Sequence, residues 1–434
     1  MRWLFLGCYV GVVAGLAAAS ARDAELYELP PINYSATQPK DAIAGLQKRL
    51  HDGSLKFSGN DRQLLEAFLR ELEIPTESQV IVFSKTSFQR QRIRPDHPRA
   101  IYFSDTCYVG WVPGGLMEVT AVDPILGPIF YALDPTVMRT NATQCFVRDN
   151  DCLRCHGGAF ARGIPGVFVR SLFTDAGGEP MLKYGSEVVD FRTAFTNRWG
   201  GWYVTGKHGT AVHRGNVLAH EKNGELEVDL KRGANIRDLS RFFDTDNYLT
   251  NSSDIVALLV LEHQTTMQNT LTRASLNCRR MLDYQKNLQR ELKEKVTEEL
   301  VYDSVKSVFD GAAREIVDDL LFQGEAPLPA GLEGAAGFQQ AFQRNARRTP
   351  EGRSLKEFSL KGHLFQNRCS YLIYSDAFLG LPTQLKQRVY ARLAVLLKPE
   401  TNEPRFAYLN AEERTRIRKI LQATLPEAAV AVGL

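Results

Sequence analysis

Five short stretches between residues 79 and 131 decide the fold: 79–83 (QVIVF), 100–103 (AIYF), 108–112 (YVGWV), 119–122 (VTAV) and 129–131 (IFY). Each is rich in β-branched or aromatic residues, and Asp, Pro and Gly lie between them. Such runs, separated by turn residues, are typical of antiparallel strands. Similar stretches follow at 167–173, 201–205 and 211–217. The sequence therefore predicts a β-containing region in the middle of the chain.

The segments on either side have helical spacing. Between residues 41 and 72 the apolar side chains recur every three or four positions, which fits two short helices. Asp254 is placed to cap a long helix that runs to about Leu300. Residues 323–353 are rich in Gly, Ala, Pro and Gln and are expected to form a linker or loop. The expected fold class is α+β, mainly helical, with the β-containing region in the middle.

These patterns divide the chain into successive segments. They are an N-terminal arm with helices at 22–78, the β-containing region at 79–240, a long helical segment at 241–322, the linker or loop at 323–353, and a C-terminal helical region at 354–434.

Composition excludes several classes of protein. The 434 residues are 44% hydrophobic and 24% charged, a balance typical of globular domains and not of disordered chains. Seven Cys are too few, at this length, for a small disulfide scaffold. The formal net charge of +3 provides no strong field for nucleic acid, and no nucleic-acid partner is expected.

Residues 1–21 have the pattern of a signal peptide. Arg2 precedes an apolar stretch at 4–19, and the small residues Ala19, Ser20 and Ala21 fit a cleavage site. The longest later apolar run, 255–261, is much shorter than a membrane span. We therefore expect a periplasmic or otherwise exported protein with no stable membrane span after cleavage.

Residues 151–156 (DCLRCH) place Cys152, Cys155 and His156 in a Cys-x-x-Cys-His pattern, the attachment signature of a c-type haem. The two thiols add across the two vinyl groups of the macrocycle, and two intervening residues match the separation of those groups. The adjacent His then turns its imidazole onto the iron as an axial ligand. Haem c is attached outside the bacterial cytoplasmic membrane, where a signal peptide directs a chain. The sequence thus predicts one covalent haem c in the β-containing middle region.

Two other functions of the motif were considered. A redox Cys-x-x-Cys is usually found beside a βαβ unit, and the sequence shows no such unit here. Half of a zinc site would need a second Cys or His pair with close spacing, and none is present. Haem attachment is the interpretation that the sequence favours.

The sixth iron ligand has several candidates. His213 lies in a segment rich in Gly and aromatic residues, far enough along the chain to fold back over a haem, and is the first choice. The alternatives are His208 in the same segment, His263 with Met267 on one face of the long helix, and Met181 beside a Pro. His208 and His213 could equally be loop residues, and His263 and Met267 could equally be core residues.

Four further Cys of the mature chain, Cys107, Cys145, Cys278 and Cys369, could form two disulfides in any of three pairings. One haem motif in a chain several times larger than a small cytochrome leaves two functions open. The first is an exported monohaem c-type cytochrome that transfers electrons to or from a redox partner protein. The second is a haem c-dependent oxidoreductase, peroxidase-like or acting on a small-molecule substrate, with an open distal face.

Several stretches resemble a family of exported bacterial single-haem proteins with a cytochrome c domain. They are 82–89 (VFSKTSFQ), 108–111 (YVGW), the Cys-x-x-Cys-His motif, 199–206 (WGGWYVTG) through 213–216 (HRGN), 253–264 (SDIVALLVLEHQ) and 369–375 (CSYLIYS). The resemblance covers most of the mature chain and implies haem and iron binding, without a substrate. The family has Met at the position of Arg214, so this position supplies no Met ligand here.

Overall fold

The computed structural model describes residues 25–140 and 146–426, so the expected signal peptide and Cys145 lie outside the described residues. Helices account for 40% of the structure and antiparallel sheets for 14%, which confirms the α+β class. The strands are β1 (Val80–Val82), β2 (Arg99–Phe103), β3 (Cys107–Trp111), β4 (Met117–Asp123), β5 (Gly127–Leu133), β6 (Val147–Arg148), β7 (Val169–Leu172), β8 (Ser186–Val189), β9 (Trp202–Tyr203), β10 (His220–Lys222) and β11 (Glu225–Glu227). The α-helices are α1 (Ala42–His51), α2 (Asp61–Glu71), α3 (Pro135–Thr140), α4 (Leu153–His156), α5 (Ile255–Glu291), α6 (Asp303–Leu320), α7 (Ala336–Arg344), α8 (Asp376–Leu379), α9 (Thr383–Leu396) and α10 (Ala411–Thr424).

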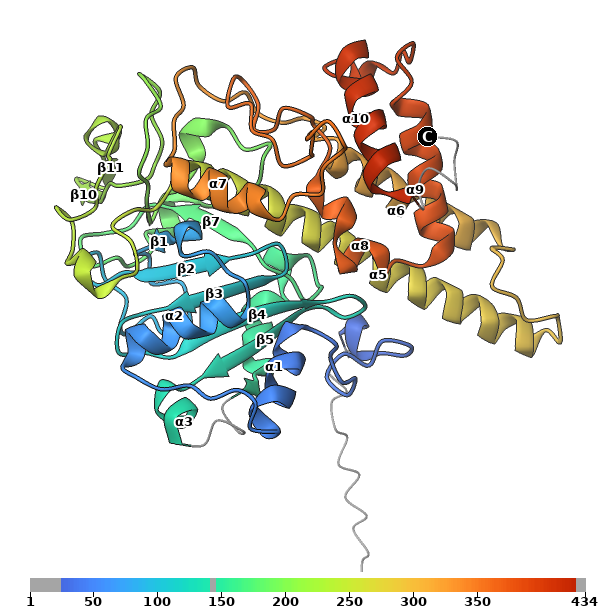
Figure 1. The fold of residues 1–434 in the computed structure, drawn as a ribbon, viewed down its shortest axis with the longest axis horizontal. Helices are drawn as coiled ribbons and strands as arrows, with labels where there is room; N and C mark the ends of the chain where they lie inside the picture. Colours follow the sequence, from blue (N-terminus) through green and yellow to red (C-terminus); the bar gives the residue numbers. More distant parts are fainter. Residues whose placement is uncertain (1–24, 141–145, 427–434) are drawn as a thin grey trace, which may run out of the picture.

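The centre of the fold is a seven-stranded sheet with the order β6-β5-β4-β3-β2-β1-β9 (Figure 1). Strands β1 to β5 form a meander in which each pairs antiparallel with the next. They coincide with the five stretches quoted first, so the prediction of antiparallel strands is confirmed. Strand β9 joins the edge from much later in the chain, with Ile81 opposite Tyr203.

The two faces of this sheet pack against different helices because side chains alternate along each strand. Tyr102, Trp111 and Val119 belong to one cluster of buried residues together with the apolar sides of α1 and α2. In Figure 1 these two helices cover the near face. Tyr108 and Phe130 point to the opposite face and belong to the cluster that contains α5.

Helix α5 begins as predicted and ends earlier. Asp254 is its N-cap, and its carboxylate accepts from the backbone N–H groups of Val256 at 2.9 Å and Ala257 at 3.0 Å. Residues 253–265 are buried without interruption. A helix that is buried on every side belongs to the core, and α5 lies between the sheet and α6. It ends at Glu291, before the expected Leu300.

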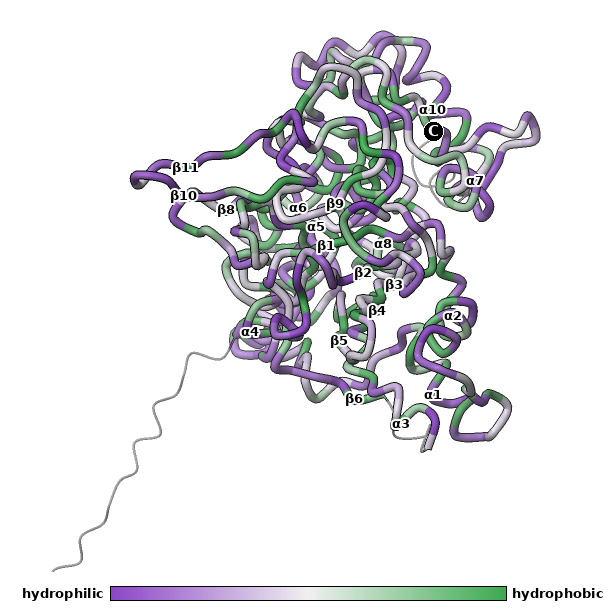
Figure 2. The backbone as a smooth tube through the Cα atoms, turned by 90° about the vertical axis from the view of Figure 1, so that its left-hand side faces the viewer, coloured by the Kyte–Doolittle hydropathy of each residue, from purple (hydrophilic) through white to green (hydrophobic). Residues whose placement is uncertain are grey.

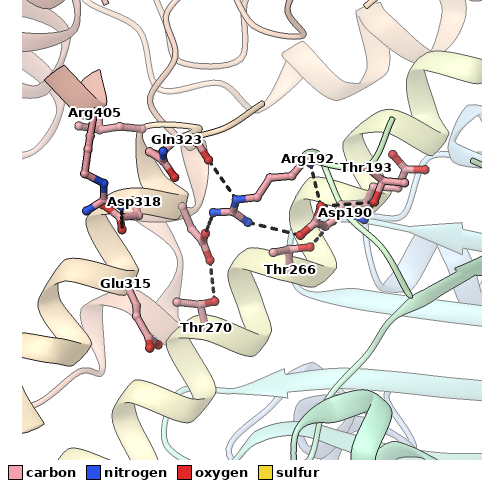
Figure 3. Close-up of polar contacts among 12 residues, drawn as sticks. Asp190, Arg192, Thr193, Thr266, Thr270, Glu315, Asp318, Gln323 and Arg405 are labelled. Atoms are coloured by element: carbon pink, nitrogen blue, oxygen red, sulfur yellow. Dashed lines mark hydrogen bonds and ion pairs between the residues drawn. The ribbon is translucent and has the colours of Figure 1, made fainter. Parts of the chain in front are cut away.

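A polar contact ties the middle region to α5 and α6 (Figure 3). Arg192, which follows β8, donates to the backbone carbonyl of Gln323 at 3.0 Å and forms an ion pair with Asp319 of α6. Asp319 also accepts from the hydroxyl of Thr270 on α5 at 2.6 Å. These contacts fix the two helices relative to the loop that leads to β9.

The stretch 323–353, expected to form a linker or loop, is irregular on both sides but contains α7 in its middle, which was not expected. Phe338, Ala341 and Phe342 are spaced three and four residues apart, so they share one face of the helix and are buried in the core. The Gly, Ala and Gln residues around them hid this short apolar face in a composition typical of loops.

The periphery of the molecule is polar. Figure 2 shows the β10–β11 hairpin projecting from the body as a hydrophilic ribbon, and its residues are mostly exposed. Among residues 25–140 and 146–426, none of the helices has both the length and the apolar character needed to cross a membrane.

Replacing Asp254 with Ala should lower the free energy of unfolding by about 2 kcal/mol, the upper part of the range for N-cap removal. The reason is that the carboxylate also accepts from the N–H of Ala335, so two buried donors and one part-buried donor lose their partner. Urea unfolding measures the change. Asn60→Ala, which removes the exposed N-cap of α2, serves as the control and should cost about 1 kcal/mol. Equal losses in the two variants would contradict the prediction.

Candidate cofactor site

The Cys-x-x-Cys-His motif forms one continuous helical turn. A 3-10 turn at Asn150–Cys152, capped by the side chain of Asp149, leads directly into α4. Cys152, Cys155 and His156 are therefore related as i, i+3 and i+4, the spacing that places side chains on one face of a helix. All three line the same cavity.

The imidazole of His156 is held in one orientation. Its Nδ1 lies 2.8 Å from the backbone carbonyl of Gly166. A carbonyl only accepts, so Nδ1 carries the proton and Nε2 keeps a free lone pair. The ring packs with Phe130 and Phe168, with centroids 4.7 Å and 5.1 Å away. Burial lowers the pKa of His156, which favours the neutral imidazole that metals bind.

The two thiols of the motif are free and differ in exposure. Cys155 is exposed, and Cys152 is half-buried. Burial, with a contribution from Asp149, raises the pKa of Cys152 to about 12, so this group is a neutral thiol at pH 7. Addition of a thiol to a vinyl group transfers both the sulfur and the hydrogen to the double bond, so both groups have the composition that attachment needs.

The cavity beside the motif has a volume of about 420 Å³. This is within the range of cavities that bind small molecules and cofactors. Its walls come from four parts of the chain: the face of the sheet turned towards α5, the loop at 85–90, the segment from the motif to β7, and the start of α5. The lining includes Val82, Ile101, Tyr108, Thr120, Phe130, Phe160, Val167, Phe168, Trp202 and Leu261.

One ion pair lies on this mostly apolar wall. Arg99 of β2 reaches across β3 to Glu118 of β4, and both side chains are more than four-fifths buried. The guanidinium lies directly over Gly110, where a Cβ atom would be only 2.1 Å from Arg99 Nη2. Any side chain at this position of β3 would displace the pair. No local sequence pattern marks Arg99 or Glu118 as part of a site.

His208 and His213 lie together, away from the cavity. Their ring centroids are 4.6 Å apart. Both ring nitrogens of His208 are bonded to backbone groups, the Ala211 carbonyl at 2.9 Å and the Asn235 N–H at 3.0 Å. His213 Nδ1 accepts from the Gly215 N–H at 2.9 Å. Neither residue lines the cavity, so His213 as the sixth ligand stays a prediction that requires this segment to move.

The other candidate ligands also lie outside the cavity lining. His263 is fully buried, with Nε2 2.7 Å from the hydroxyl of Ser370 and its ring stacked on Phe322 at 4.1 Å. Met267 is buried in the same core. Met181 precedes a short 3-10 helix and donates its backbone N–H to the carbonyl of Phe173 at 2.9 Å. The structure therefore brings His156 together with the two motif Cys, and with none of the five proposed partners.

The remaining Cys of the described chain are reduced. Cys107, Cys278 and Cys369 are buried free thiols, and burial raises the pKa of each to about 12. No two of these three residues form a disulfide. Each of the three pairings left open by the sequence needs such a bond, so none of them is formed.

The burial of His263 predicts a specific pH dependence of stability. Its pKa is lowered to about 3 by burial, against about 6.5 in an unfolded chain. Between these values the unfolded state binds a proton that the folded state does not, so stability falls as the pH decreases below 6.5. From pH 7.5 to pH 5 this residue should cost the wild type about 2 kcal/mol.

Urea unfolding of the wild type and of His263→Phe at both pH values measures this effect. His263→Phe lacks the titrating group. The change from pH 7.5 to pH 5 should therefore lower its free energy of unfolding by about 2 kcal/mol less than it lowers that of the wild type. Gln in place of His51, which is exposed on α1, is the control and should produce no such gain. A parallel pH dependence in wild type and His263→Phe would show that His263 is not held neutral in the core.

Comparisons with models of protein families, with curated proteins and with solved structures found no match for this chain. The function proposed next therefore rests on the cavity, the residues that line it and the pattern of the motif.

Proposed function

We propose that the protein is an exported c-type cytochrome that carries one haem, bound covalently through Cys152 and Cys155 with His156 as an axial ligand. The observation that carries the proposal is that all three residues share one face of a helical turn and open into a cavity of about 420 Å³. Bound haem would supply a redox-active iron. The residues around the motif would hold and orient such a group.

The residues around His156 prepare it for this role. The Gly166 carbonyl fixes the tautomer, as the second partner of a metal-bound His usually does. Phe130 and Phe168 restrict rotation of the ring. The sheet face of the cavity is mostly apolar, and the polarity around a haem is one of the means by which a protein sets its reduction potential.

The mouth of the cavity favours electron exchange with a partner protein. Phe88 and Phe160 line the cavity and are 69% and 44% exposed. Exposed aromatic residues are enriched at protein interfaces. Arg90 and Arg170 lie beside them, and the Arg170 guanidinium stacks on Phe160 at 4.3 Å. A partner with acidic side chains around its own redox centre would match this rim.

The alternative, a haem c-dependent oxidoreductase, is favoured by a different observation. Apart from His156, none of the His and Met residues in the described part of the chain lines the cavity. With this packing, the iron would keep one position for an exogenous ligand, as catalysis at a haem requires.

Covalent attachment is tested by expressing the chain in a bacterium that matures c-type cytochromes and staining a denaturing gel for haem. The wild type should retain haem, and the double variant Cys152→Ser with Cys155→Ser should lose it completely. The single variants should retain haem through one thioether, with a shifted pyridine haemochrome band. Cys369→Ser, at a buried free thiol far from the motif, is the matched control and should stain normally. Absence of covalent haem in the wild type would refute the proposal.

The state of the sixth position is tested by adding carbon monoxide to the reduced protein. Binding would support the oxidoreductase. A low-spin spectrum that carbon monoxide does not change would support electron transfer with two protein ligands. In that case His213→Ala should convert the haem to high spin if His213 is the ligand.

A further inference from the structure

The ion pair between Arg99 and Glu118 is a costly feature of the cavity wall. Transfer of two charges from water into a protein is unfavourable unless hydrogen bonds satisfy both groups. Here each partner keeps an unsatisfied atom, because Arg99 Nε and Glu118 Oε1 are buried without a hydrogen-bond partner. The pair therefore keeps one donor and one acceptor unsatisfied, and since neither atom has accessible surface, a ligand reaches them only when the two side chains shift.

The ion pair constrains the residue on the strand that it crosses. The two residues are on β2 and β4, so the guanidinium must cross β3, and it can do so only because Gly110 leaves the space above the strand empty. The neighbouring positions on this face, including Ile101, Tyr108 and Phe130, are apolar or aromatic. If the wall had only a structural role, apolar residues at positions 99 and 118 would fill the same space without burying two charges.

The pair is close to the residues that would hold the haem. Both Arg99 and Glu118 line the cavity together with Cys152 and His156. Both charges are felt at these two groups and act in opposite directions: Glu118 raises and Arg99 lowers the pKa of Cys152 and of His156, while burial is the main cause of the shift in each. A ligand that enters the cavity meets this pair among the mostly apolar side chains of the sheet face.

We propose that Arg99 and Glu118 form a hydrogen-bonding site for a small oxygen-bearing ligand that binds in the cavity at the haem iron, a proposal that rests on the haem function above. The guanidinium donates to an oxygen atom of the ligand, and the carboxylate accepts from its O–H group. The matching chemical class is the hydroperoxides, of which hydrogen peroxide is the smallest. Gly110 is the positioning residue, because it allows the guanidinium to lie across the strand.

Two probes report on the pair directly. In the reduced protein with carbon monoxide, the C–O stretching frequency decreases when a positive charge lies near the oxygen atom. Arg99→Leu should therefore shift the infrared band to higher wavenumber, and Glu118→Gln should shift it to lower wavenumber. In the oxidised protein, Arg99→Leu should weaken fluoride binding roughly tenfold to a hundredfold, the ratio expected for loss of one hydrogen bond to a charged group.

The variants are chosen so that misfolding does not obscure the result. Removal of one partner leaves a buried charge unpaired, so the double variant Arg99→Leu with Glu118→Leu is made as well, because an apolar pair restores the packing. It should show the same loss of fluoride affinity. Arg99→Lys keeps the charge without the planar fork and should bind fluoride with intermediate affinity. Arg94→Leu is the control, since this exposed Arg lies outside the cavity lining and should have no effect.

Covalent haem content is measured first in every protein. Normal haem content with an unchanged infrared band and unchanged fluoride affinity would overturn this inference and leave the proposed function intact. Failure of the wild type to bind carbon monoxide or fluoride would also overturn it, because a protein side chain would then occupy the sixth position. Absence of covalent haem in the wild type would instead overturn the proposed function itself.

Discussion

The burial of the first turns of α5 on every side is the constraint on which the rest of the structure depends. Its first turns lie between the sheet and α6, so each polar side chain there must find a partner inside the protein. Glu262 forms an ion pair with Arg198 at 2.5 Å, in which both side chains are almost fully buried. Gln264 donates to the Ser104 carbonyl at 2.7 Å and accepts from the Tyr371 hydroxyl at 2.6 Å. These contacts link the sheet, the segment before β9 and the C-terminal region through a single helix.

The same constraint shapes the cavity. Helix α5 covers the sheet along one line, and Leu261 and Thr265 mark where it borders the space in front of β2 to β4. The motif residues cover this space from the other side. The site is thus the part of the sheet face that α5 leaves free, and its position follows from how the helix crosses the strands.

Much of this architecture can be read from local patterns in the sequence. The strands of the meander have alternating or continuous apolar residues between turns, and Asp254 precedes a long apolar helix, so both are determined by neighbouring residues. Cys152, Cys155 and His156 were identified because their spacing within one turn is itself the signal. Helix α7 was missed because its two Phe residues lie among residues common in loops.

The ion pair on the cavity wall could not be predicted from local patterns. Arg99 and Glu118 are charged residues in short strands, and a charge in a strand is ordinarily assigned to the solvent face. Their pairing depends on strand register and on the missing side chain at Gly110, which only the assembled sheet reveals. The positions of His213 and His263 likewise depend on contacts between distant segments, since Gly-rich loops and helical faces occur in many settings.

The environment of His156 has a consequence for the conditions under which the site can work. A proton and a metal ion compete for the same lone pair on Nε2, so the pKa of the imidazole sets the acidity at which a ligand is lost. Since burial lowers that pKa, protons compete weakly until the pH falls below the ordinary range of histidine. If His156 holds the proposed haem, burial of its ring would keep it coordinated in acidic surroundings, and the hydrogen bond to the Gly166 carbonyl would act in the opposite direction.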